Sequence, residues 1–186
     1  CGGDNSSCST AIDINGNIYN TVLIGNQLWM AENLNTDIGN GSCYGNDSDN
    51  CETYGRLYAW NDINNNNICP DEWHVPTDDE WKELEVFLGM SSDQTNLLAV
   101  WRGTQEGGKI KDAGFNHWIS PNTGATNESG FSALGGGHQT NTGTDVHING
   151  SAYFWTSTSR TSDQAWARHL GYGTAQIYRD SWHKSQ

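Results

Sequence analysis

The sequence predicts an α+β fold, and three features along the chain support this class. Residues 11–36 have the pattern of β-strands separated by turns, and a capped amphipathic helix follows Thr77. From Gly103 onward, short aromatic or apolar runs alternate with Gly, Asn and Thr. Strands, then two helices, then loops and further strands are typical of α+β proteins.

The N-terminal β region covers residues 11–36. Turn signals at Asn15-Gly16 and Gly25-Asn26 bracket the run IYNTVLI, which is rich in β-branched and aromatic residues. The segment DINGN resembles the front of a calcium loop but lacks the glycine and glutamate of that loop, so a β-turn is expected. Residues 37–53 are expected to be loop.

The clearest helix begins after Thr77. Thr77 is expected to be the N-cap, with Glu80 as its capping-box partner and Gly89 as the C-terminal stop. The apolar face of this helix is made by Trp81, Leu84 and Leu88, with Lys82 and Glu85 away from it. We expect Trp73, Trp81 and Leu84 to be core residues.

The rest of the chain is expected to contain a second, weaker helix over residues 93–101 and none after Gly103. Neither a repeat nor a linker divides the 186 residues. The sequence therefore predicts a polar tether over residues 1–10 and a single domain over residues 11–186.

Charge and composition exclude several classes of function. The formal net charge is −13, with only nine basic residues, which excludes nucleic acid as a partner because phosphate binding needs basic patches. It also argues against direct adsorption on anionic lipid. An apolar run of the ~18 residues needed for a membrane span is absent. Nine tryptophans predict a core built from large rings.

The first residue, Cys1, is a candidate lipidation site. Small polar residues follow it, in the stretch GGDNSS. Bacterial lipoprotein maturation cuts a signal peptide before a cysteine and acylates its thiol, so a lipid on Cys1 is expected to hold the protein at the outer membrane. The alternative is a chain boundary that falls at Cys1 by coincidence.

The other four cysteines, Cys8, Cys43, Cys51 and Cys69, are expected to form two disulfides. None lies in a C-x-x-C spacing, so a zinc ribbon or a thioredoxin-type site is not indicated. Cys43 and Cys51 bracket a short polar loop, and Cys8 would then pair with Cys69. Three pairings are open from the sequence alone.

Oxygen-rich loops supply weak candidates for a structural calcium site. They are Asp47 and Asp49, Asp62, and Asn122 near the segment PNTGATNES. The alternative is that these loops are simply solvated. A cofactor is otherwise not expected.

Aromatic side chains in loops are weak candidates for binding a sugar, because sugars pack their apolar faces on rings. Most rings are expected in the core, with Tyr44, Trp118 and Trp182 as candidates for display at the surface. The sequence has neither a G-x-S-x-G elbow nor an S-x-x-K or P-loop motif, and His74 stands alone and is expected to bond to backbone. We therefore nominate no catalytic residue and expect no enzymatic activity.

Five segments together resemble a known family. They are DINGNIYNTVLIGNQLWMAENL, YGRLYAW, CPDEWHVPTDDEWKELEVFLG, PNTGATNESGFSALGGG and YFWTSTS with AWARHL, in this order. In this combination the chain resembles the Fibrobacter succinogenes major paralogous domain from about Ala11 to the end. The resemblance implies an exported protein or lipoprotein of Bacteroidetes or similar bacteria, on the surface of a Gram-negative cell.

A more distant similarity bears on the fold. The segment EWHVPTDDEW is similar to formylglycine-generating-enzyme-like domains, which implies a variant C-type-lectin-like fold with two helices, twisted antiparallel strands and long ordered loops. The enzyme's activity is not implied, because its paired C-terminal cysteines have no counterpart after Cys69. Lectin-type calcium binding is also not implied, because Ser120-Pro121-Asn122 lacks the carboxylate of the lectin triplet.

These observations favour a non-catalytic, surface-exposed lipoprotein that binds a protein or glycan partner, as an accessory subunit of an outer-membrane complex. One alternative is an extracellular enzyme acting on polysaccharide or protein, which a carboxylate pair in a deep cleft would favour. The other is a structural or adhesive surface module. Partner contacts are expected in loops of the second half, over residues 117–128 and 138–150.

We predict that Cys1 of the natively expressed protein carries two or three acyl chains, because a single chain binds a membrane only marginally. Intact-mass measurement of protein extracted from native membranes tests this. An unmodified N-terminal cysteine would contradict the prediction.

Overall fold

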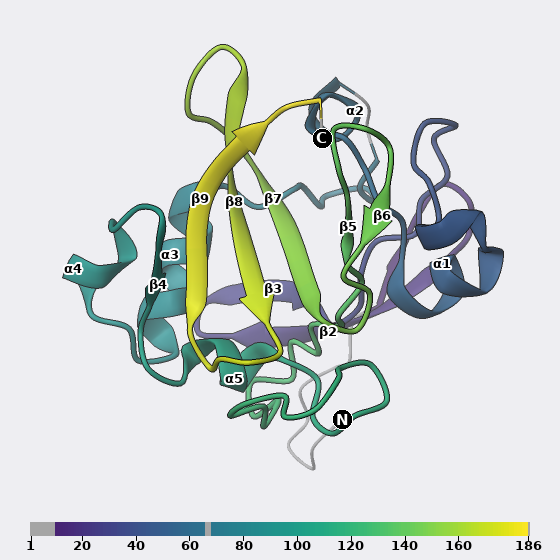
Figure 1. Ribbon diagram of the computed structural model, residues 1–186. Helices are drawn as coiled ribbons and strands as arrows, with labels where there is room; N and C mark the ends of the chain where they lie inside the picture. Colours follow the sequence, from purple (N-terminus) through teal and green to yellow (C-terminus); the bar gives the residue numbers. More distant parts are fainter. Residues whose placement is uncertain (1–9, 66–67, 186) are drawn as a thin grey trace.

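The N-terminal strands form a three-stranded antiparallel sheet in the computed structural model, which describes residues 10–65 and 68–185 (Figure 1). Its strands are β1 (Thr10–Ile12), β2 (Ile18–Ile24) and β3 (Gln27–Met30). Gly16 and Gly25 both have positive φ in the two connecting turns, where glycine adopts this conformation without strain. The predicted strands and turns of this region are confirmed.

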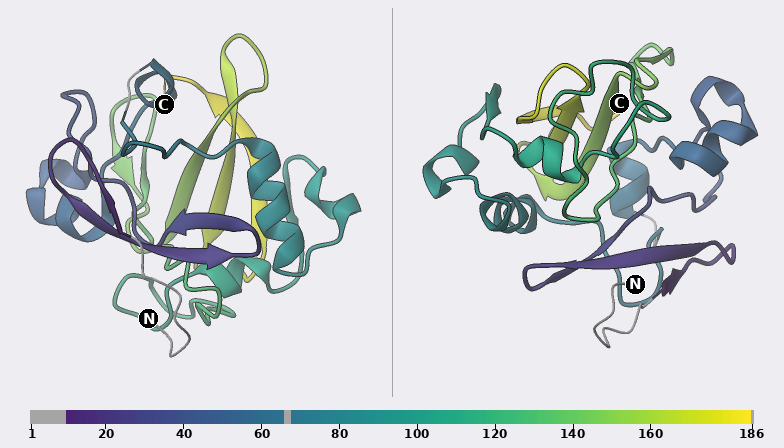
Figure 2. Two further views of the ribbon diagram at one scale, coloured as in Figure 1. Left: turned by 180° about the vertical axis from the view of Figure 1, so that it is seen from behind. Right: turned by 90° about the horizontal axis from the view of Figure 1, so that it is seen from below.

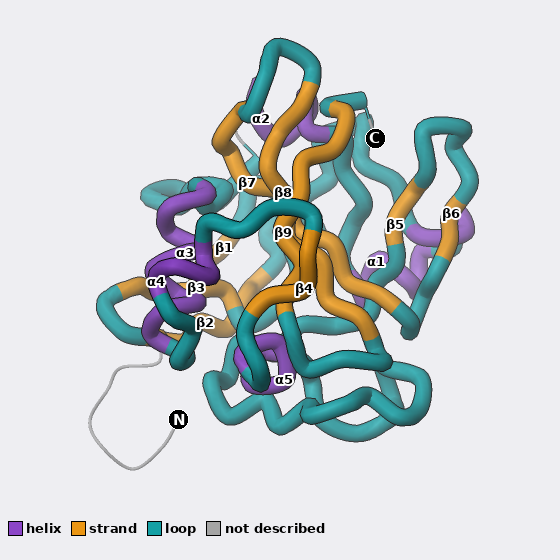
Figure 3. The backbone as a smooth tube through the Cα atoms, turned by 60° about the vertical axis from the view of Figure 1, so that its left-hand side comes forward, coloured by secondary structure: helices purple, strands orange, loops and turns teal. Residues whose placement is uncertain are grey.

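A larger antiparallel sheet has the strand order β4-β9-β8-β7. Its members are β4 (Val100–Arg102), β7 (Ser151–Ser159), β8 (Gln164–Gly171) and β9 (Ile177–His183). A short separate hairpin, β5 (His138–Gln139) and β6 (Asp145–Val146), stands beside β7 (Figure 1). The residues between α5 and β5 are mostly loop, so the expected long ordered loops are present (Figure 3).

The helices are short except for one. They are the 3-10 turn η1 (Tyr44–Asn46), α1 (Ser48–Tyr54), α2 (Trp60–Asn65), α3 (Asp78–Phe87), α4 (Ser92–Thr95) and α5 (Glu106–Ile110). Helices together with antiparallel sheets confirm the α+β class. The helices of residues 10–65 and 68–185 all lack the length and apolarity that a membrane span requires.

The expected count of two helices is wrong, and the differences have physical causes. The predicted helix over residues 93–101 ends at Thr95, because Val100–Arg102 pairs with β9 instead. Helix α5 was missed because it contains Gly107 and Gly108, which are poor helix formers. Both glycines are required by close packing, since an added Cβ would collide with the backbone of Gln176 and of Gly124 respectively.

Helix α3 carries the predicted capping box. The Thr77 hydroxyl accepts from Glu80 N at 3.1 Å, and the Glu80 carboxylate accepts from Thr77 N at 2.7 Å. The helix and the β2–β3 hairpin cover the inner face of the large sheet, as the view from behind shows (Figure 2). The expected apolar face is confirmed, because Trp81, Leu84 and Leu88 are all buried in the core.

The core is built largely from aromatic rings. Trp81 lies 5.3 Å from Trp29, 5.7 Å from Phe131 and 5.5 Å from Phe154, measured between ring centroids. Tilted contacts of this kind add stability beyond the burial of the ring area. This agrees with a core of large rings, as the tryptophan count predicts.

Asp78 and Glu85 of α3 are buried against three arginines of the sheet. Glu85 accepts from Arg102 Nη2 at 2.7 Å and from Arg168 Nε at 2.6 Å. Asp78 accepts from Arg168 Nη1 at 2.8 Å and from Arg179 Nη2 at 2.7 Å. Glu85 was expected to lie off the apolar face of the helix. Its carboxylate is nevertheless fully buried, where it pairs with arginines of the sheet.

We predict that Glu85→Gln lowers the free energy of unfolding by about 3–5 kcal/mol, because it leaves Arg102 and Arg168 buried without their counter-charge. The matched control is Asp79→Asn, nearly two turns earlier on the same helix, where the side chain is 91% exposed. It should change stability by no more than about 0.5 kcal/mol. Urea unfolding of both variants tests this, and equal stabilities would contradict a structural role for the cluster.

Candidate functional site

A cavity of about 900 Å³ opens beside β7, the edge strand of the large sheet. Its walls come from β3, from residues 54–63 and 68–76, from the start of the β5–β6 hairpin, and from β7 and the end of β9. A volume of this size is typical of small-molecule sites and is large enough for several linked sugar rings.

Two indole hydrogen bonds fix one wall of the cavity. Trp155 Nε1 of β7 donates to Tyr58 O at 3.1 Å, and Trp60 Nε1 donates to Thr156 O at 2.7 Å. The strand pairing shifts register between Trp155 and Ser159, which is the irregularity expected of a bulge. Residues 58–60 are thereby held along the free edge of the sheet.

Half-buried aromatic rings line the cavity. They are Tyr58, Trp73, Tyr153, Trp155 and Trp182. The prediction that Trp73 belongs to the core is wrong, because its side chain is half-buried and lies outside the buried core cluster that contains Trp29 and Trp81. Trp73 instead lies in the turn closed by its N–H to Pro70 O, at 3.0 Å, and lines the cavity.

Polar groups surround the rings. The lining includes the amides of Asn33, Asn40, Gln139 and Asn141, and Asn40 donates to the Asp62 carboxylate at 3.1 Å. Arg56 also lines the cavity, but its Nη2 is paired with Asp37 at 2.7 Å. Aromatic walls with amide and carboxylate edges can stack on a flat ligand and hydrogen-bond to its hydroxyls.

The aromatic row continues across the outer face of the large sheet. Tyr153 stacks on His169, with 4.3 Å between centroids and 6° between planes, and His169 lies 5.0 Å from Trp101. Tyr153 also contacts Trp182 at 4.7 Å and His138 at 4.3 Å. In Figure 1 this face is turned toward the viewer and α3 lies behind the sheet.

The imidazoles in this row are held uncharged near neutral pH. Burial lowers the pKa of His169 to about 4, and repulsion from His138 and His147 adds to this effect. Burial and the neighbouring His147 also lower the pKa of His138. The imidazoles of this aromatic row therefore add no positive charge to the outer face at neutral pH.

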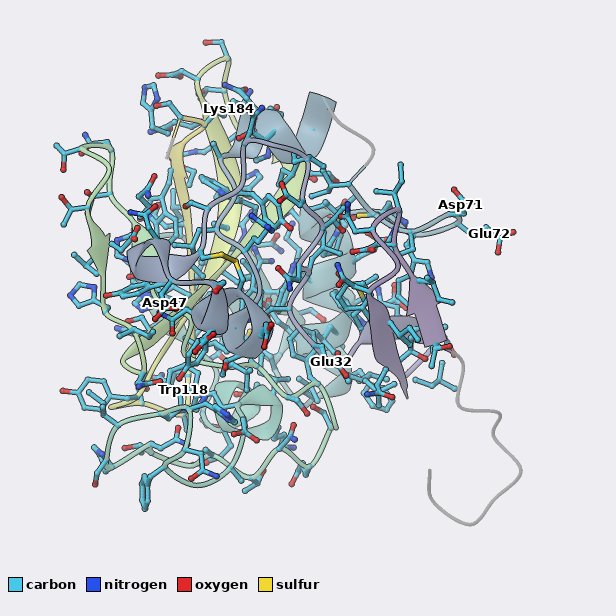
Figure 4. All side chains as sticks on the ribbon, turned by 90° about the vertical axis from the view of Figure 1, so that its right-hand side faces the viewer. Glu32, Asp47, Asp71, Glu72, Trp118 and Lys184 are labelled. Carbon is cyan, nitrogen blue, oxygen red and sulfur yellow. A yellow bond between two sulfur atoms is a disulfide. The ribbon has the colours of Figure 1, made fainter. Side chains whose placement is uncertain are left out.

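The three rings predicted to bind a ligand, Tyr44, Trp118 and Trp182, lie in different environments. Trp182 is half-buried and lines the cavity. Tyr44 is half-buried in η1, and its ring is not among the residues that line the cavity. The prediction that Trp118 is displayed is wrong, because it is fully buried and its Nε1 donates to Ala133 O at 3.0 Å (Figure 4).

The calcium candidates lie on separate elements. Asp47 caps α1 by accepting from Asp49 N at 3.1 Å, and Asp62 lies in α2. Asn122 is buried and uses its amide to donate to Asp112 O and Gly114 O. The described ranges contain no group of three or more His, Cys, Asp or Glu side chains placed to hold a metal ion. Calcium binding stays a prediction without support from this arrangement.

The segment DINGN forms the predicted turn rather than an ion loop. The buried Asp13 carboxylate accepts hydrogen bonds from Tyr19 at 2.6 Å and from Thr36 at 2.9 Å, as well as from Asn17. Burial by itself would raise the pKa of Asp13, but these hydrogen bonds outweigh it and lower the pKa to about 2.

The predicted Cys43–Cys51 disulfide is present, with the two Cα atoms 4.9 Å apart. Cys69 carries a free thiol, so the predicted bond to Cys8 finds no support, and both Cys8 and Cys1 lie outside the described residues. Cys69 lines the cavity, and burial raises the pKa of its thiol to about 11. The thiol is therefore protonated at neutral pH and a poor nucleophile.

His74 was expected to hydrogen-bond to backbone, but it bonds to a side chain instead. Its Nε2 lies 2.9 Å from Glu80 Oε1, at the rim of the cavity. Burial acts to raise the pKa of Glu80, but the hydrogen bonds from Thr77 and His74 lower it overall. This carboxylate is already engaged in the capping box.

Sequence reasoning missed Tyr58, Tyr153, Trp155 and His169. The alternation of large rings in YFW places Tyr153 and Trp155 on one face of a strand, and this period of two could have identified them. Of the expected contact loops, residues 138–141 line the cavity and residues 117–128 do not.

Comparisons with known proteins identify the family. The chain belongs to the Fibrobacter succinogenes major domain family, whose model matches residues 22–186. The resemblance stated from the sequence is thereby confirmed. Comparison with the curated proteins and with the solved structures finds no match.

We predict that the protein loses stability as the pH falls from about 6.5 to about 4, partly through His169. In this window the unfolded chain protonates this histidine and the folded protein does not, so the unfolded state binds more protons. His169→Phe, which keeps a ring but cannot titrate, should flatten the dependence.

Urea unfolding at several pH values measures this effect. Parallel curves for the unaltered protein and His169→Phe would contradict the prediction.

Proposed function

We propose that this protein is a non-catalytic binding module whose cavity takes a glycan chain. The observation that carries the proposal is the group of half-buried rings facing a cavity of about 900 Å³, namely Tyr58, Trp73, Tyr153, Trp155 and Trp182. Sugar rings have apolar C–H faces that stack on aromatic rings, while their hydroxyls need the amides and carboxylates found around them.

The rings are positioned before any ligand arrives. Hydrogen bonds from Trp155 to Tyr58 O and from Trp60 to Thr156 O hold two walls together, and ring contacts hold Trp182 against Tyr153. A site whose side chains are already ordered loses less entropy on binding. This supports recognition of a ligand by a preformed surface.

The chemistry of the carboxylates supports binding over hydrolysis. A glycosidase commonly needs one carboxylic acid with a raised pKa, placed opposite a second carboxylate. The pKa of Glu80 is lowered, and its oxygens are engaged by Thr77 and His74. Asp62 accepts a hydrogen bond from Asn40.

We further propose that the module is exported, as an outer-membrane lipoprotein on the cell surface, and that its fold is a C-type-lectin-like variant. The Cys43–Cys51 disulfide supports an oxidising compartment outside the cytosol. The packing of α3 on a twisted antiparallel sheet beside long loops supports the lectin-like comparison (Figure 2). In this setting the module serves as an accessory subunit that holds glycan for an outer-membrane complex.

A protein partner is the second candidate, and a separate observation favours it. The first strands and turn expose large apolar side chains, namely Ile12, Ile14, Ile18, Leu23 and Leu28. Exposed apolar side chains on neighbouring strands are typical of a protein contact. Pull-down from envelope extracts, compared between the unaltered protein and Ile12→Ser/Ile18→Ser, tests this role independently of the cavity.

We predict that Trp73→Ala and Trp182→Ala each weaken glycan binding by about tenfold or more, because each removes a stacking wall of the cavity. Trp101→Ala is the matched control, since Trp101 is partly exposed on the same face but does not line the cavity. It should leave affinity unchanged.

Isothermal calorimetry with neutral hexasaccharides of glucose, galactose and mannose measures this, with thermal melting to confirm folding. Equal glycan affinities of all three variants would contradict the proposal that the cavity binds the glycan. Shorter products after long incubation would favour the enzymatic alternative.

A further inference from the structure

All nine basic side chains of the protein are engaged within the protein itself. Arg102, Arg168 and Arg179 are buried with Asp78 and Glu85 in the cluster beneath α3. Lys111 is fully buried and donates to three backbone carbonyls, those of Thr123, Gly171 and Thr174. Four of the nine are therefore out of reach of any ligand.

The five remaining basic side chains also have partners. Arg56 pairs with Asp37, Lys82 with Asp78 and Asp79, and Lys109 with Glu128. Arg160 donates to Ser181 at 2.7 Å, and Lys184 donates to the carbonyls of Thr161 and Ser162 at 3.1 Å. An arriving anion would have to compete with one of these contacts.

The cavity itself carries an excess of carboxylates. Glu32, Asp62, Glu72 and Glu80 line it, against the single guanidinium of Arg56. Arg56 donates from Nη1 to Gly41 O at 3.1 Å and from Nη2 to Asp37 at 2.7 Å. Figure 4 shows Glu72 beside Asp71 on a projecting loop.

We infer that the cavity selects uncharged glycans and rejects acidic ones, such as chains of uronic acids. This inference rests on the proposed function and names its ligand class. A uronic acid carboxylate would enter a partly desolvated space, next to four like charges and without an uncommitted cation to pair with. Specificity of this kind comes from repulsion of the wrong ligand as much as from attraction of the right one.

Matched glycans that differ only in charge test the inference. The probes are the neutral hexasaccharides of glucose, galactose and mannose, each with its C6-oxidised uronic acid form and the methyl ester of that form. At about 20 mM salt we expect each acid form of a bound sugar to bind at least about tenfold more weakly than its neutral form, with the ester restoring affinity. At about 1 M salt, where the Debye length is about 3 Å, the difference should shrink.

The outcomes separate the two claims. If neutral hexasaccharides bind and their acid forms bind equally well or better, the inference is overturned while the proposed function stands. If no probe binds in any form, the proposed function fails and the inference fails with it.

A pair of double variants locates the source of the selectivity. Asp62→Asn/Glu72→Gln removes two charges at the cavity, and Asp93→Asn/Glu128→Gln removes two from α4 and from the loop after α5. The cavity variant should lower the ratio of neutral to acid affinity several-fold at low salt, and the control variant should leave this ratio as it is in the unaltered protein. Equal effects of the two variants would attribute the repulsion to net charge and overturn a selective role for the cavity.

Discussion

The buried contact between the carboxylates of α3 and the arginines of the large sheet is the constraint on which the rest of the structure depends. Asp78 binds Arg168 and Arg179, and Glu85 binds Arg102 and Arg168, so three strands are tied to one helix. Burial by itself would raise the pKa of Asp78, but Arg179 and Arg168 hold it well below its usual range. The geometry has to be kept, because a misplaced partner would leave a buried charge uncompensated.

This cluster places charged side chains on the inner face of the large sheet, beside the apolar core. Along β8, Arg168 points to the helix and is fully buried, whereas its neighbour His169 lies on the outer face among Tyr153, Trp101 and Tyr178. Strand alternation along β8 therefore places Arg168 on the inner face and His169 on the outer face. Of the rings on the outer face, Tyr153 and Trp182 also line the cavity.

The parts of the fold that could be predicted from the sequence are those set by local chemistry. The capping box of Thr77 and Glu80, the turns at Gly16 and Gly25, and the Cys43–Cys51 bond all depend on residues close in the chain. The burial of Glu85 could not be predicted in this way, because its arginine partners lie 17 and 83 residues away. The site was missed for the same reason, since Tyr58 O accepts a hydrogen bond from Trp155 of β7, 97 residues further on.

The number of tryptophans predicts an aromatic core but does not say which rings belong to it. Trp118 was expected at the surface and is buried, whereas Trp73 was expected in the core and lines the cavity. Both stand in polar segments that give no indication of burial, yet Trp118 is enclosed between Ala133 O and the Lys111 ammonium, 5.3 Å from its ring. Trp73 lines the cavity and lies outside the buried core cluster that contains Trp29 and Trp81. With Arg102, Arg168, Arg179 and Lys111 buried, the accessible surface keeps its carboxylates and its aromatic rings. Such a surface offers hydrogen-bond acceptors and stacking faces, which suits a polyhydroxylated, uncharged ligand better than an anion.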